Sequence, residues 1–129
     1  MKRGPVFLEA THVSRIHARL ILEFGGEEGL RDAGLLESAV AMPKARLGGK
    51  FLHKGLADMA AAYLFHLVSN HPFLDGNKRT GLTAAILFLK LNQHGLDATD
   101  DELEELTMGV ASGRRSKAQV VSFFRRHVL

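Results

Sequence analysis

The chain has 129 residues, of which 46% are hydrophobic and 24% are charged, a composition that argues against a disordered chain and allows one buried core. Seventeen Lys and Arg residues against 14 Asp and Glu residues leave a net charge of +3, which permits an anionic ligand but does not by itself indicate nucleic-acid binding. The absence of cysteine excludes disulfides and thiolate metal sites, and no apolar run approaches the length of a membrane span. We therefore expect a cytoplasmic protein with a single domain, residues 1–129.

Apolar residues at helical spacing predict two helices in the first third of the chain. Residues 12–24 carry apolar side chains at every third or fourth position, and the pattern stops at the pair Gly25–Gly26. Residues 32–42 repeat the pattern between Asp32, a residue typical of helix N-caps, and Pro43, which cannot continue a helix.

The middle of the chain predicts the centre of the fold. Residues 46–55, RLGGKFLHKG, are rich in glycine and too short for a helix, so we expect a loop or a small hairpin. Residues 56–70 are apolar on several faces, which is typical of a buried central helix. A second very apolar helix follows residues 71–80 and is expected to close near Gly95.

Two capping boxes mark the last helices. Thr99 is followed three positions later by Glu102, and Ser116 is followed by Gln119, the spacing at which side chain and backbone cap each other. No strand alternation is evident. The sequence therefore predicts an all-α fold, a compact bundle of about six helices with two apolar helices at its centre.

The stretch HPFLDGNKRT, residues 71–80, joins those two central helices and places cations at an unfavourable position. A helix N-terminus carries a partial positive charge, so Lys78 and Arg79 in the first turn should destabilise the second helix unless they bind an anion. An anion such as phosphate would accept bonds from the free backbone N–H groups and also pair with both cations. Gly76 would let the backbone approach that anion closely.

Other residues of this stretch have the chemistry of a phosphoryl-transfer site. His71 could act as general base toward an incoming hydroxyl, and Asp75 is a natural ligand for Mg²⁺. Phe73 is expected to anchor the loop in the core. Any one of these residues alone is typical of an ordinary turn. Their combination between the two most apolar helices favours a functional site.

The same residues carry a resemblance to a known family. HPFLDGNKR resembles the signature of the Fic/Doc superfamily, whose AMP-transferring members read approximately H-P-F-x-D/E-G-N-G-R-x-x-R. Lys78 replaces the glycine of that pattern and Leu82 replaces its second arginine, and both differences match the Doc branch, the death-on-curing toxins. Residues 24–40 and 101–126 are also similar to Doc-type chains, so the resemblance extends over nearly the whole sequence.

The resemblance implies a Fic/Doc-type fold and a toxin of a type II toxin–antitoxin system. Such a toxin is a protein kinase that transfers the γ-phosphate of ATP to a threonine of elongation factor Tu, which blocks translation, and a Phd-like antitoxin restrains it. His71 would be the catalytic base and Asp75 the ligand of Mg²⁺. The nucleotide phosphates would be held by Gly76, Asn77, Lys78 and Arg79.

Alternatives remain open at this point. The chain could be a Fic-type AMP transferase, or a non-catalytic module that binds only a nucleotide or a partner. Residues 46–55 lie where Fic-type folds carry a flap that aligns the target, which makes Lys50 and His53 candidate target contacts, although a plain connection fits equally well. A basic C-terminal patch reads as a solvated helix surface, so direct nucleic-acid binding is not expected.

Overall fold

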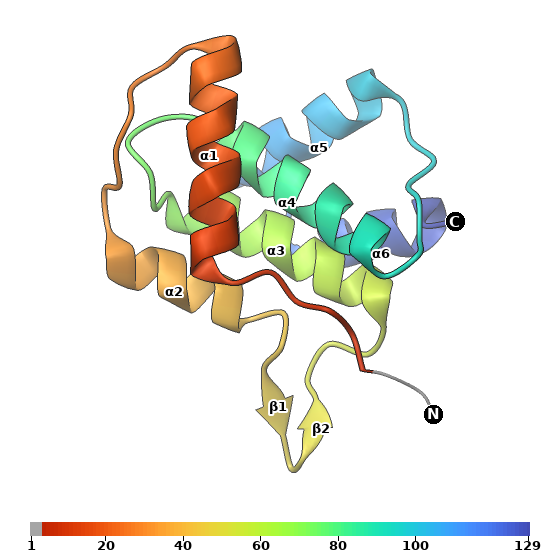
Figure 1. Ribbon diagram of the computed structural model, residues 1–129. Helices are drawn as coiled ribbons and strands as arrows, with labels where there is room; N and C mark the ends of the chain where they lie inside the picture. Colours follow the sequence, from red (N-terminus) through yellow and green to blue (C-terminus); the bar gives the residue numbers. More distant parts are fainter. Residues whose placement is uncertain (1–3) are drawn as a thin grey trace.

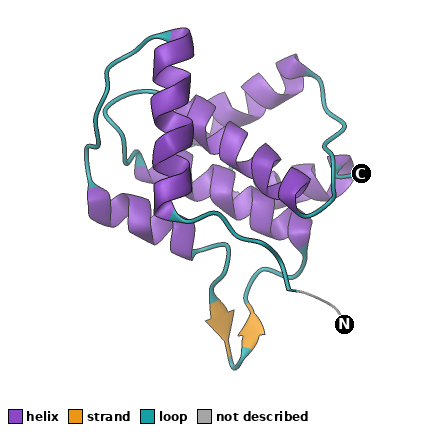
Figure 2. Cartoon of the chain, in the orientation of Figure 1, coloured by secondary structure: helices purple, strands orange, loops and turns teal. Residues whose placement is uncertain are grey.

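Helices make up most of the structure, a computed structural model that describes residues 4–129 (Figure 1, Figure 2). Within that range the six helices are α1 (Ala10–Phe24), α2 (Ala33–Ala41), α3 (Leu56–Asn70), α4 (Asn77–Leu91), α5 (Asp100–Ala111) and α6 (Lys117–His127). A two-stranded hairpin, β1 (Arg46–Leu47) and β2 (Lys50–Phe51), connects α2 to α3. The predicted bundle of about six helices is confirmed. No helix within the described range is long and apolar enough to cross a bilayer.

The pair α3 and α4 forms the centre of the bundle (Figure 1). Helix α3 packs against α4, α6, α2 and α5, which explains why its sequence is apolar on several faces. Helices α3 and α4 approach closely at Gly81, where a Cβ atom would lie 2.9 Å from Val68 Cγ2 and 3.4 Å from the Leu64 carbonyl oxygen. This close contact fixes the two helices whose ends carry the loop 71–76.

Caps set most helix boundaries where the sequence predicted them. Asp32 Oδ1 accepts a hydrogen bond from Leu35 N at 2.9 Å and so begins α2. The capping boxes at Thr99 and Ser116 form as expected and begin α5 and α6. Each cap satisfies backbone N–H groups that a helix N-terminus leaves without partners.

The predicted end of α4 near Gly95 is wrong. The helix ends at Leu91, and Asn92 is its C-cap residue. The Asn92 side chain donates to Phe88 O at 2.8 Å and accepts from Val6 N at 2.8 Å, which ties the helix end to the N-terminal segment. The chain then turns at residue 93, whose φ is 69°, so the left-handed position falls two residues before the glycine.

The segment 46–55, for which a loop and a hairpin were both open, contains a hairpin. Arg46 pairs with Phe51 and Leu47 with Lys50, and Gly48 and Gly49 form the turn with φ values of 59° and 79°. Positive φ at both turn residues matches the right-handed twist of the strands. The hairpin projects away from the helices at the bottom of Figure 1.

Candidate active site

The loop 71–76 turns the chain sharply between α3 and α4. His71 ends α3 in the left-handed region, with φ 51° and ψ 55°, and its side chain lies at the surface. Phe73 is only 3% exposed and stacks on the His17 ring of α1, with ring centroids 3.8 Å apart and planes 5° apart. Phe73 therefore anchors the loop in the core, as the sequence predicted. Gly76, with φ 78°, then begins α4.

Asn77 closes the loop from inside. Its Oδ1 accepts from Phe73 N at 3.0 Å and its Nδ2 donates to Phe73 O at 3.0 Å. The side chain is only 6% exposed. Asn77 was expected to bind phosphate, but its side-chain amide group already bonds the loop backbone. The backbone N–H of Asn77, at the first position of α4, has no hydrogen-bond partner among residues 4–129.

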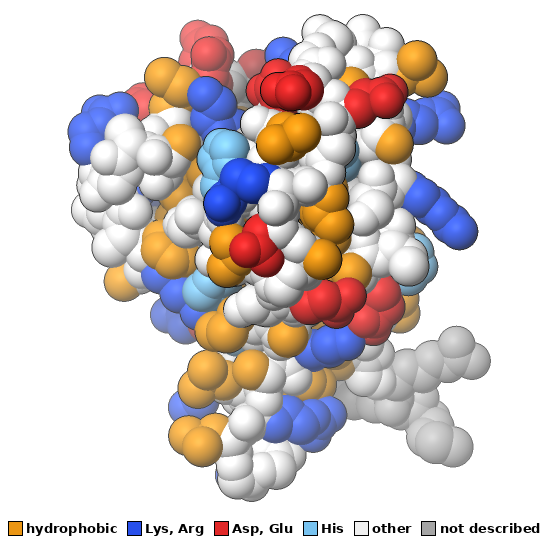
Figure 3. All heavy atoms as spheres, turned by 90° about the vertical axis from the view of Figure 1, so that its left-hand side faces the viewer, with side chains coloured by type: hydrophobic (Ala, Val, Ile, Leu, Met, Phe, Trp, Pro, Cys, Tyr) orange, Lys and Arg blue, Asp and Glu red, His pale blue; other side chains and the backbone are white. Residues whose placement is uncertain are grey.

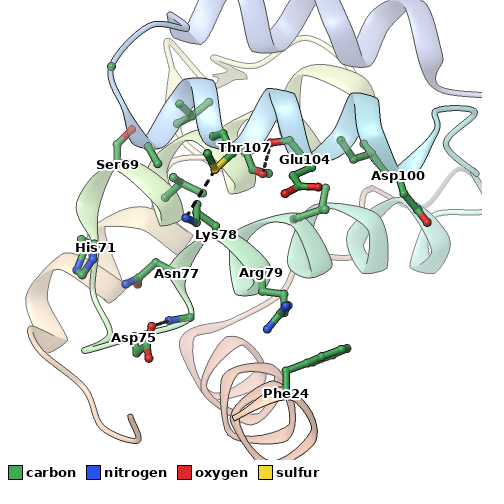
Figure 4. A pocket seen from close by; sticks show the side chains of 18 residues that line it. Phe24, Ser69, His71, Asp75, Asn77, Lys78, Arg79, Asp100, Glu104 and Thr107 are labelled. Atoms are coloured by element: carbon green, nitrogen blue, oxygen red, sulfur yellow. Dashed lines mark hydrogen bonds between the residues drawn. The ribbon is translucent and has the colours of Figure 1, made fainter. Parts of the chain in front are cut away.

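The N-terminus of α4 has no side-chain cap and carries two exposed cations. Lys78 points toward α5, with its Nζ 3.9 Å from Met108 Sδ, whereas the Arg79 guanidinium lies 4.1 Å from the centre of the Phe24 ring (Figure 4). Neither cation forms an ion pair with a carboxylate among residues 4–129. The partial charge of the helix N-terminus and both side-chain charges therefore favour an anion at this position.

Asp75 presents an ionised carboxylate next to that helix end. Its Oδ2 accepts from Glu27 N at 3.1 Å and its Oδ1 accepts from Gly76 N at 2.8 Å. These two N–H groups, and then the nearby charges of His17 and His71, hold the pKa of Asp75 below its ordinary value. His17 also donates from Nε2 to the Asp75 carbonyl oxygen at 2.8 Å, which fixes the backbone of this residue.

A cleft of about 1290 Å³ opens in front of these residues, between the loop and α5 (Figure 4). His71, Asp75 and Asn77 lie along one side of it, and Glu104 and Thr107 of α5 lie across from them. The apolar part of its lining consists of Phe24, Val68, Leu82, Leu103, Met108, Val110 and Ala111. The cleft combines a large apolar surface with a few charged groups, as expected for a ligand site.

The two candidate target contacts lie outside this cleft. Lys50 is exposed on β2 of the hairpin. His53 is only 6% exposed, so its side chain is part of the packed interior and not available to a target in this structure. The expectation that His53 contacts a target is therefore not supported by its position, whereas the position of Lys50 remains compatible with one.

Arg31, which no motif in the sequence indicates, contacts the loop through its guanidinium group. Its Nε donates to His71 O at 2.6 Å and its Nη2 donates to Asn70 O at 2.9 Å. His17 and the backbone of Glu27 were missed as well. None of these residues follows a motif that encodes the contact, because each is 39 to 58 positions away from its partner.

The structure thus presents a helical bundle with an exposed histidine beside an uncapped, cationic helix N-terminus. The sequence model of the Fic/DOC family matches residues 7–89, more than half of the chain. The chain therefore belongs to the Fic/DOC family.

Two relatives are named after toxins or kinases of this family. The chain is 45% identical over 93 residues to the protein named Toxin Doc of Mycolicibacterium smegmatis, an alignment that covers 70% of this chain and 72% of the relative. It is 36% identical over 112 residues to Protein kinase doc of Escherichia phage P1, covering 86% of each chain.

Proposed function

We propose that this protein is a Doc-type toxin, a protein kinase that transfers the γ-phosphate of ATP to a threonine hydroxyl of elongation factor Tu. The names of the two relatives support a toxin and a protein kinase. The single observation that carries the chemistry is the N-terminus of α4, which has no side-chain cap and lies in the same cleft as the exposed His71. Its two cations, Lys78 and Arg79, pair with no carboxylate in the described part of the chain.

The nucleotide phosphates bind at that helix end. Backbone N–H groups of Asn77, Lys78 and Arg79 point out of the first turn and lack intrahelical partners, so phosphate oxygens can accept their hydrogen bonds. Lys78 adds an ammonium group and Arg79 adds a planar guanidinium that the Phe24 ring supports. The positive charges that repel one another at this helix end therefore strengthen the binding of phosphate.

His71 accepts the proton of the target hydroxyl. The imidazole is exposed, so a protein substrate can reach it, and it lines the same cleft as the phosphate-binding residues. Phosphoryl transfer depends mainly on positioning and charge neutralisation. A general base contributes a further factor of about 10²–10⁴ in rate.

Asp75 is the residue that would hold Mg²⁺. Its carboxylate is exposed and its pKa is lowered, and each oxygen accepts only one hydrogen bond, so lone pairs remain for a cation. The ion, when bound, would neutralise phosphate charge. The donor chemistry of Asp75 thus fits the group that the family resemblance implies.

Two sequence differences favour γ-phosphate transfer over AMP transfer. Lys78 occupies the position where AMP-transferring members carry glycine, so its side chain fills space beside the phosphates. Leu82, which lines the cleft, replaces an arginine that would clamp a further phosphate. AMP transfer remains the second candidate, because the cleft volume of about 1290 Å³ does not fix the direction in which a nucleotide lies.

A labelling experiment separates these reactions. Purified protein is incubated with elongation factor Tu, Mg²⁺ and ATP labelled at either the γ- or the α-phosphate. We expect label on the factor only from γ-labelled ATP, none with His71→Ala, and unchanged transfer with His94→Ala, which alters a histidine hydrogen-bonded to Leu129 O. Label arriving from the α-phosphate would identify an AMP transferase. Activity of the His71→Ala protein would remove the proposed base.

The proposed biological context is a cytoplasmic toxin–antitoxin pair. A Phd-like antitoxin restrains the toxin, and the hairpin that carries Lys50 contacts the target. Expression of the protein alone should stop growth and translation, and co-expression of the partner antitoxin should restore both. Normal growth in the presence of soluble wild-type protein contradicts the toxin assignment. If the protein is instead a nucleotide-binding module without catalysis, His71→Ala should stop growth and translation as fully as wild type.

A further inference from the structure

Residues 26–32, the connection between α1 and α2, run antiparallel along the active-site loop. Gly26 and Glu27 lie against Asp75, and Leu74 N donates to Gly29 O at 3.0 Å. Leu30 and Phe73 form an isolated antiparallel bridge. As residues 26–30 run forward, their contacts therefore step backward along the loop from Asp75 to Phe73, in the direction of His71. Both segments lie on the left side of Figure 1, and Figure 3 shows that face, where histidine and basic side chains are adjacent.

This connection is shaped to fit the loop closely. A Cβ atom at Gly26 would lie 2.8 Å from Asp75 Oδ2, and one at Gly29 would lie 2.9 Å from Leu74 Cδ1. Both glycines also have positive φ, 117° and 127°. A side chain at either position would displace the Asp75 carboxylate or the Leu74 side chain, so glycine at both positions permits this close packing of the two segments.

Arg31 holds three consecutive carbonyl groups at the end of this register. Its Nη2 donates to Asn70 O at 2.9 Å, its Nε donates to His71 O at 2.6 Å, and its backbone N–H donates to Pro72 O at 2.7 Å. These carbonyls lie at the end of α3 and just beyond it, where a helix leaves its acceptors without partners and attracts a cation. A guanidinium satisfies several of them at once because its donors have a fixed planar arrangement.

His71 is the middle one of these three residues, and its backbone is in the left-handed region, which residues other than glycine seldom adopt. Its φ of 51° requires support from the surroundings, since a non-glycine residue in the left-handed region is strained. We propose that Arg31 is a positioning residue, which keeps His71 in this conformation and so directs the imidazole toward the phosphate-binding end of α4. The inference rests on the proposed function for its catalytic consequence.

A lost positioning residue should reduce turnover and leave nucleotide binding intact. The phosphate-binding groups belong to α4, whose first turn Asn77 ties to Phe73, whereas the hydrogen bonds of Arg31 within the described range go to Asn70, His71 and Pro72. Arg31→Ala should therefore lower kcat by about 10–100-fold with the KM for ATP changed by less than about twofold. Arg31→Lys, which supplies one ammonium group in place of the planar guanidinium, should recover only part of the wild-type kcat.

The experiment compares Arg31→Ala, Arg31→Lys and the control Arg19→Ala. Arg19 is an exposed arginine of α1 whose side chain forms no hydrogen bond or ion pair with the described residues. Steady-state kinetics of γ-phosphate transfer gives kcat and KM, and millimolar guanidinium, far below denaturing concentrations, should restore part of the Arg31→Ala rate. Two-dimensional NMR of the imidazole C–H groups, assigned with His71→Ala, should show a shifted or broadened His71 signal in Arg31→Ala only.

The outcomes separate the two proposals. If wild-type protein transfers no phosphate, the proposed function fails, and the His71 signal still decides the role of Arg31. Wild-type kcat in Arg31→Ala, or an unchanged His71 signal, overturns the inference. Should Arg31→Ala fail to fold, Arg31→Lys decides: a reduced kcat with wild-type KM supports positioning, and a wild-type kcat contradicts it.

Discussion

Asn77→Ala removes both hydrogen bonds that close the active-site loop on itself. The Phe73 N–H and C=O groups each bond the Asn77 amide at 3.0 Å, and both residues are buried. Leaving a buried backbone group without a partner costs about 1–3 kcal/mol. Because the substitution leaves two such groups without their partner, we expect the free energy of unfolding to fall by about 2–4 kcal/mol. Urea denaturation followed by circular dichroism should show a midpoint lowered by about 1–2 M at an m-value of about 2 kcal/mol/M.

Two further variants show whether Asn77 acts on the loop or on the nucleotide. Asn77→Asp keeps an acceptor for Phe73 N–H but sets a carboxylate against the Phe73 carbonyl, so it should also destabilise the protein. Lys78→Ala changes an exposed neighbour, and it should leave stability within about 0.5 kcal/mol of wild type while weakening ATP binding. If Asn77→Ala keeps wild-type stability and loses only ATP affinity, the side chain is a ligand and our assignment is incorrect.

Three other substitutions test the core that supports the site. Tyr63→Phe should lower the free energy of unfolding by about 1–3 kcal/mol, because the hydroxyl accepts from Leu8 N at 2.8 Å and donates to Leu8 O at 3.1 Å. Burial, aided by nearby positive charges, lowers the pKa of His66 to about 4, so the unfolded chain binds more protons below pH 6.5. Stability should fall as the pH drops from 6.5 toward 4, by about 1–2 kcal/mol after allowing for the partly exposed ring, and His66→Leu should remove this loss. Gly81→Ala adds about 1 kcal/mol of helix propensity but costs about 1–3 kcal/mol by overpacking the α3–α4 contact, so the protein should be equally stable or less stable than wild type. Val68→Ala in the same chain should relieve the overpacking.

Each of these substitutions has an outcome that contradicts its reasoning. If Tyr63→Phe is as stable as wild type, the two hydrogen bonds between the hydroxyl and Leu8 contribute nothing to the free energy of unfolding. An undiminished acid dependence in His66→Leu assigns the effect to another group. A Gly81→Ala protein that is more stable than wild type, measured by thermal and urea denaturation, shows that α3 and α4 can separate slightly without cost.

The helices and their caps were largely predictable because their signals are local. The three N-cap predictions, at Asp32, Thr99 and Ser116, are confirmed, since the cap and its partner are three residues apart in the sequence. The start of α1 was missed by two residues because Glu9 and His12 form a capping box from residue types that the usual pattern does not include. The turn after α4 was misplaced because Gln93, not a glycine, takes the positive φ.

The site was predictable as a motif but not as an arrangement. Residue types in the loop indicated a phosphate site, and the structure brings Asp75, Lys78 and Arg79 around one cleft with His71. The direction of the Asn77 side chain was not predictable, because an asparagine in a turn can bond either its own loop or a ligand. The contacts of residues 26–32 join segments about 40 positions apart, and no periodicity in the sequence records such a pairing.

The most direct test of the central claim is a crystal structure with Mg²⁺ and an ATP analogue that cannot be hydrolysed between its β- and γ-phosphates. We predict that the phosphates accept hydrogen bonds from the backbone N–H groups of Asn77, Lys78 and Arg79, with the His71 imidazole directed at the γ-phosphate. A nucleotide bound elsewhere, or an imidazole turned away from the terminal phosphate, would contradict the account.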